Sequence, residues 1–150
     1  QKLIAFFIQT HKIYGTAVFE NIRRIHMQPT EEMKKAIEQL EKVDGWICNG
    51  LVNYQKGVSA LNEDSDPKDQ SNYFPQQCTA IMKTLGASLK NLQGGTPQKL
   101  VVEASNMTMM IYTVDDTYFC GVGLKPGTEL KEASQKLSLV REAFKKAIAK

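Results

Sequence analysis

The hydrophobic pattern of the chain predicts three amphipathic helices. In each stretch the apolar residues recur every three or four positions, which is the spacing of one face of an α-helix. We expect these helices at residues 30–43, 74–92 and 130–148. Thr30 supplies a side-chain oxygen that can cap the first helix, and Gly94 and Gly95 follow the second. The third pattern is the most regular in the sequence.

Five shorter apolar runs lie between turn-forming residues, as is typical of β-strands. We expect them at 46–54, 58–61, 100–104, 108–114 and 117–124. The first two surround a turn that contains Gly57 and predict a hairpin. The last three are joined by the turn-prone pairs Ser105-Asn106 and Asp115-Asp116, and they predict a three-stranded meander.

The order of these elements predicts one α+β domain over residues 29–150. Its arrangement is αββαβββα, with a five-stranded antiparallel sheet and helices in two or three layers. Residues 1–28 precede this unit and are predicted to form an accessory arm. The apolar spacing there favours a helix, and a strand at Leu3–Ile8 is the alternative. The run is far shorter than the ~20 residues of a membrane helix, so we expect no membrane insertion.

Composition and charge exclude two classes of protein. The chain has 150 residues, of which 42% are apolar, and this is too hydrophobic for a disordered protein. Its 19 Lys and Arg against 16 Asp and Glu give a net charge of +3, too little to indicate a nucleic-acid partner. Cys48, Cys78 and Cys120 lie in apolar stretches, and we interpret them as reduced core residues of a cytoplasmic protein.

The sequence contains no pattern that predicts catalysis. The histidines are His11 and His26, both in the arm, and neither a nucleophile elbow nor a zinc-binding spacing is present. In the acidic loop 62–72, Pro67 occupies the position where a calcium loop needs glycine. Gly94–Lys99 is similar to a phosphate loop but leads into a strand instead of a helix. We therefore expect no enzyme activity, no metal and no cofactor.

Several stretches resemble the Roadblock/dynein light chain family, whose domains have a profilin-like fold. These are the Val43-Asp44-Gly45 boundary before the first strand, the Tyr54–Gly57 turn, the strand Leu100–Glu103 and the strand Thr117–Gly123. Together with the element order, the resemblance covers residues 29–150. The family includes bacterial polarity proteins that regulate small GTPases, scaffolds for lysosomal GTPases, and subunits on dynein intermediate chains.

The resemblance implies a homodimer in which two copies of one edge strand pair. The matching interface positions are the strand residues Lys99, Leu100, Val101, Val102, Glu103 and Ala104, with the second-helix residues Ile81, Leu85 and Leu89. An apolar edge strand is also a physical reason to expect association. Lys99 and Glu103 flank the strand, so opposite charges can meet across an antiparallel self-pair.

Our first functional hypothesis is a non-catalytic dimeric scaffold or regulator that binds a small Ras-like GTPase or a larger assembly. The expected partner-binding positions are exposed on the second helix: Gln76, Gln77, Lys83 and Lys90. The alternatives are a structural subunit of a motor or signalling complex, and a small-molecule sensor. A sensor would hold its ligand between the sheet and the second helix, in a cavity lined by Trp46, Met110, Tyr112 and Tyr118.

Overall fold

The computed structural model describes residues 27–149. Both histidines and the predicted fold of the accessory arm lie outside these residues. The elements are α2 (Glu31–Glu41), β1 (Trp46–Asn53), β2 (Val58–Ser59), the short 3-10 helix η1 (Gln70–Asn72), α3 (Tyr73–Asn91), β3 (Lys99–Glu103), β4 (Thr108–Thr113), β5 (Tyr118–Leu124) and α4 (Leu130–Ile148). All three predicted helices and all five predicted strands are therefore confirmed.

The five strands form one antiparallel sheet in the order β2-β1-β5-β4-β3. β5, the last strand in sequence, lies in the centre between β1 and β4. β2 and β3 are the two edges, and they differ in length, since β2 has two residues and β3 has five. A longer edge presents more unpaired backbone groups, so β3 is the edge that most needs a partner or protection.

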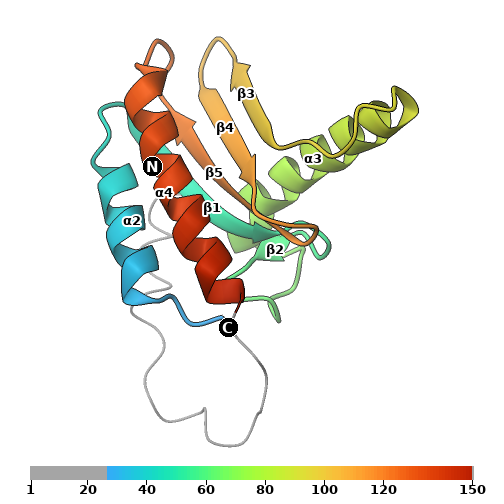
Figure 1. Cartoon of the computed structure of the whole chain (residues 1–150), viewed down its shortest axis with the longest axis horizontal. Coiled ribbons are helices and arrows are strands. Elements are labelled where there is room, and N and C mark those ends of the chain that lie inside the picture. Colours follow the sequence, from blue (N-terminus) through green and yellow to red (C-terminus); the bar gives the residue numbers. More distant parts are fainter. Residues whose placement is uncertain (1–26, 150) are drawn as a thin grey trace, which may run out of the picture.

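Helices cover both faces of the sheet, which makes three layers. In Figure 1, α2 and α4 lie side by side on one face and α3 runs behind the other. The larger core cluster joins α2 and α4 to their face of the sheet, with Met33, Leu40, Leu137 and Phe144 almost completely buried. The smaller cluster lies under α3 and contains Val52, Cys78, Met82, Ile111 and Phe119. This arrangement confirms the predicted fold class.

Local interactions explain where α2 begins. The Thr30 hydroxyl accepts a hydrogen bond of 3.2 Å from the backbone N–H of Met33, and Glu31 and Glu32 occupy the first turn. An N-cap of this kind stabilises a helix by about 1 kcal/mol, and acidic residues at the start interact favourably with its dipole. The capping role predicted for Thr30 is confirmed.

Among residues 27–149, no helix is both long and apolar enough to span a lipid bilayer. The three cysteines are free and buried, as predicted for core residues. Burial raises the pKa of Cys78 and Cys120 to about 12, so both thiols stay protonated near neutral pH. Reactive thiolate chemistry is therefore not available to these two side chains.

Candidate functional site

The outer edge of β3 has backbone groups that pair with nothing in residues 27–149. On its inner side, Gln98 C=O accepts from Thr113 N–H at 2.9 Å, and Ala104 N–H donates to Met107 C=O at 2.9 Å. Backbone groups in a strand alternate in direction, so the even-numbered residues bond to β4. The N–H and C=O groups of Lys99, Val101 and Glu103 consequently point away from the sheet.

Apolar side chains accompany this open edge. Val101 is 46% exposed and Val102 is 37% exposed, although both lie in a strand. Val101 pairs with Met110 and lies on the α4 side of the sheet, whereas Val102 pairs with Met109 and lies on the α3 side. The edge is therefore apolar on both faces, which is unusual for a strand exposed to water.

Ala104 differs from the other predicted interface residues. β3 ends at Glu103, and Ala104 lies in the hairpin turn that follows. Its N–H already bonds to Met107. The residue with outward backbone groups nearest this end of the strand is therefore Glu103, and Ala104 has no free N–H for pairing.

α3 continues far beyond the part of it that packs on the sheet. Its buried residues are Pro75, Cys78, Thr79 and Met82, all in the first half of this 19-residue helix. Figure 1 shows its second half projecting past the strands on the side of β3. The projecting half therefore has an apolar surface that the rest of the chain covers only in part.

The three predicted α3 interface residues form one stripe. Ile81 is 38% exposed, and Leu85 and Leu89 follow at four-residue steps and are half-buried. Our sequence interpretation missed Leu92, which caps the helix and is 77% exposed. Its position three residues after Leu89 continues the same stripe, so the spacing already contained the signal that would have identified it.

Three of the four predicted partner-binding residues lie on a different side of α3 from the Ile81 stripe. Gln77, Lys83 and Lys90 are exposed, and Gln76 is half-buried with its side chain against Gly57. Gln76, Lys83 and Lys90 are spaced by seven residues, which aligns them along the helix. At 100° per residue this line is well over a quarter turn from the Ile81 stripe. Gln77, however, lies four residues before Ile81 and belongs to the Ile81 stripe, so only Gln76, Lys83 and Lys90 can bind a different partner at the same time.

The four residues predicted to line a sensor cavity between the sheet and α3 do not lie there. Met110 and Tyr112 are each 2% exposed within the core on the α2 and α4 face, and Trp46 and Tyr118 pack against the same cluster. α3 lies on the opposite face of the sheet. Alternation along a strand shows which residues share a face, but it does not show which helix covers that face. None of these four residues lines a space beneath α3.

Two surface hollows offer no obvious ligand site. One, of about 290 Å³, lies between the turn at Gly45 and the turn at Gly127, and the other, of about 420 Å³, lies between the start of α2 and the end of α4. Neither contains the predicted sensor residues. Within the described part of the chain, no group of three or more His, Cys, Asp or Glu side chains is arranged to hold a metal ion.

The sequence matches no protein-family model and no curated protein. The fold, however, is similar to solved structures. A Roadblock/LC7 domain from Streptomyces avermitilis aligns with a TM-score of 0.63 and 11% identity, over 76% of this chain and 94% of that one. The chain has the Roadblock/LC7 fold. This confirms the fold expected from the resemblance.

Two further structures share this Roadblock/LC7 fold. MglB from Myxococcus xanthus aligns with a TM-score of 0.65 and 11% identity, over 81% of this chain and 98% of that one. The gliding protein MglB from Thermus thermophilus aligns with a TM-score of 0.63 and 14% identity, over 79% of this chain and 90% of that one. At these identities the likeness establishes the fold, and function has to be argued from this chain's own surface.

Proposed function

We propose that the protein is a non-catalytic scaffold or regulator that forms a homodimer through β3 and α3. The observation that supports the dimer is the outer edge of β3, which combines outward backbone groups with the exposed side chains of Val101 and Val102. A second copy of the same strand would satisfy those backbone groups and cover the apolar side chains. The stripe at Ile81, Leu85 and Leu89 would extend the contact.

The charges at the edge favour one register of this pairing. An antiparallel pair centred on Val101 places Lys99 of each copy opposite Glu103 of the other. Such a pair of opposite charges stabilises a sheet by roughly 0.2–1 kcal/mol. Shifting the strands by two residues in either direction removes both contacts. We therefore propose the register centred on Val101.

The partner of the dimer in this proposal is a small Ras-like GTPase or a larger protein assembly, bound along Gln76, Gln77, Lys83 and Lys90. The arrangement of α3 supports it, because Gln76, Lys83 and Lys90 remain accessible when the Ile81 stripe is covered, whereas Gln77 lies beside that stripe. Arg141, the one arginine of residues 27–149, lies against the Tyr112 ring. Any stimulation of GTP hydrolysis would therefore act by reshaping the partner's switch loops rather than by inserting Arg141.

Proline at position 101 tests the dimer. Val101→Pro removes an outward N–H, whereas Val102→Pro removes one that bonds to β4 and should destabilise the fold itself. Val101→Thr keeps the N–H and serves as the matched control. Light scattering after size exclusion should give twice the 16.8 kDa of one chain for the native protein and for Val101→Thr, and one chain for Val101→Pro. A native protein that is monomeric at micromolar concentration contradicts the dimer.

The partner is tested separately, with purified small Ras-like GTPases of the same organism loaded with GDP or with a GTP analogue. The immobilised full chain should retain at least one of them in a nucleotide-dependent way. Lys83→Gln/Lys90→Gln should weaken retention, and Lys35→Gln/Lys42→Gln removes the same charge from α2 as a control. If the GTPase is retained equally in both nucleotide states, or equally by both double variants, the proposal of a GTPase site on α3 is contradicted. The proposal of a dimer is not affected by either result.

A further inference from the structure

One side of α4 carries mainly cationic and hydroxyl side chains, with the exposed Glu142 beside them. Spacings of three and four residues align Lys131, Ser134, Ser138, Arg141 and Lys145. The Ser134 hydroxyl lies 2.6 Å from the Tyr112 hydroxyl, which fixes this side of the helix over β4. Lys99 reaches the same place from β3. We call these six residues, with Lys99 included, the cationic shelf.

Tyr112 holds two of the cations in position. Lys99 Nζ lies 4.8 Å from the centre of the Tyr112 ring, and Arg141 Cζ lies 5.4 Å from it. The ring itself is 2% exposed, so it is part of the core and provides a rigid support. Cations held in this way lose less side-chain entropy when they bind an anion than freely moving lysines would.

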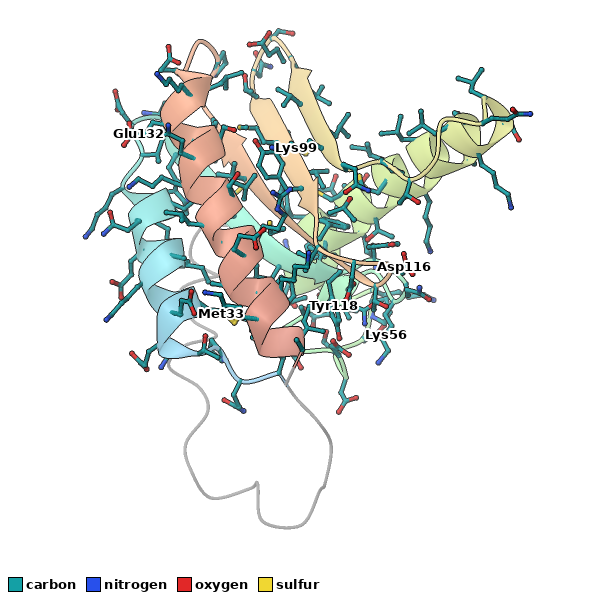
Figure 2. All side chains as sticks on the ribbon, in the orientation of Figure 1. Met33, Lys56, Lys99, Asp116, Tyr118 and Glu132 are labelled. Atoms are coloured by element: carbon teal, nitrogen blue, oxygen red, sulfur yellow. The ribbon has the colours of Figure 1, made fainter. Side chains whose placement is uncertain are left out.

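The shelf has little internal charge compensation. Among residues 27–149, Lys99, Lys131 and Lys145 form no ion pair, and Arg141 has only its exposed neighbour Glu142, with Nε 3.6 Å from Oε1. The remaining acid of α4 lies elsewhere: Figure 2 shows Glu132 and Lys99 on opposite sides of this helix. Glu103, at the far end of β3, is the one acidic residue of the strand.

From this charge pattern we propose that the cationic shelf is a docking site for an acidic segment of a partner protein, lying along α4. Its carboxylates would pair with Lys131 near the start of α4, with Lys99 and Arg141 at the Tyr112 ring, and with Lys145 near the end of the helix.

A nucleic-acid strand fits this surface less well than a peptide. Single strands bind to aromatic rings on which bases can stack, and the Tyr112 ring is covered by its two cations and by the core. The shelf is complete within one chain, so this inference does not depend on the proposed dimer. In that dimer Lys99 would also face Glu103 of the other copy, whereas Lys131, Arg141 and Lys145 would remain accessible on α4, and the two shelves would lie on the same side of one sheet.

The test uses the full chain and a fluorescent 20-residue poly-L-glutamate peptide, followed by anisotropy at low and at physiological salt. Lys131→Gln/Lys145→Gln alters two exposed positions outside the proposed dimer contact and should weaken binding about three- to ten-fold. Arg141→Gln should weaken it further. Lys35→Gln/Lys42→Gln removes the same charge from α2 and should leave the affinity almost unchanged.

Chemical-shift mapping with the same peptide locates the contact. We expect perturbed amides in β3 and along the Lys131–Lys145 side of α4. Perturbations confined to α3 would place the contact elsewhere and would overturn the site. Equal weakening by the two double lysine variants would show that the peptide responds to net charge alone, and it would overturn the site as well. Tighter and equally mutation-sensitive binding of a 20-nucleotide poly(dT) would overturn the choice of an acidic protein segment.

Discussion

At the scale of single residues, one hydrogen bond ties the loop after β2 to the sheet. The Tyr118 hydroxyl donates to the Glu63 carboxylate, and Lys56 Nζ lies 3.5 Å from the other oxygen of Glu63. Figure 2 shows Lys56 and Tyr118 near one another at this end of the molecule. Burial, followed by the hydrogen bond to Glu63 and the negative charge of that group, raises the pKa of Tyr118 to about 12.

The raised pKa predicts how the stability contributed by Tyr118 changes with pH. Because the folded state favours the neutral phenol, Tyr118 stabilises the fold fully below pH 10 and loses this contribution as the pH rises through 12. Tyr118→Phe should lower the free energy of unfolding by about 1 kcal/mol at neutral pH, and the gap to the native protein should close at alkaline pH. Urea unfolding measures the difference, with Tyr73→Phe, a change at an exposed tyrosine, as the control.

Thr79 supports a prediction in the opposite direction, because here a substitution should raise the free energy of unfolding. Its hydroxyl is buried on the inner face of α3 and has no hydrogen-bond partner among residues 27–149, which costs folding energy. Thr79→Val should therefore raise the free energy of unfolding by about 1 kcal/mol, and Thr79→Ser, which keeps the orphan hydroxyl and loses a methyl group, should lower it. A Thr79→Val protein less stable than the native one in thermal unfolding would show that the hydroxyl has a partner in solution.

At the scale of elements, sequence periodicity predicted almost every helix and strand, because each buries one regular face. Only the ends differ: β2 is shorter than expected, and β3 ends before Ala104. Which helix covers which face of the sheet could not be predicted in the same way. Met110 and Tyr112 alternate with Ile111 as expected, but the sequence does not tell which of the two sets faces α3.

The surface was less predictable than the core. The β3 edge was expected because the resemblance to the Roadblock/dynein light chain family implies pairing through this apolar strand. It did not reveal the cationic shelf, because Lys99 and Arg141 meet at Tyr112 only after β3, β4 and α4 have packed together. Contacts between residues so far apart in the chain depend on strand order, and periodicity contains no information on strand order.

The pairing of β3 with a second β3 predicts a charge-reversal pattern. In the register centred on Val101, Lys99→Glu places like charges opposite Glu103 and should raise the dimer dissociation constant several-fold. The double variant Lys99→Glu/Glu103→Lys reverses both charges and should restore the native value. Sedimentation equilibrium measures all three proteins. If the double variant is as weak as Lys99→Glu, the proposed register is wrong.

At the scale of the whole molecule, the helices cover the two faces of the sheet unequally. α2 and α4 bury one face of the sheet in a large core, whereas α3 packs with its first half only and extends beyond the strands with its second (Figure 1). The uncovered apolar surface of α3 and the open edge of β3 lie on the same side of the molecule. We therefore interpret this side as an interface between two copies.

Amide hydrogen exchange of the full chain tests this interface most directly, because adjacent residues of β3 serve as internal controls. The N–H of Val102 bonds to β4 in either case, whereas the N–H of Val101 is protected only when another strand pairs with the edge. The account predicts that Val101 is protected as strongly as Val102 at micromolar concentration and loses this protection on dilution. Exchange of Val101 at the rate of an unstructured peptide, with Val102 still protected, would contradict it.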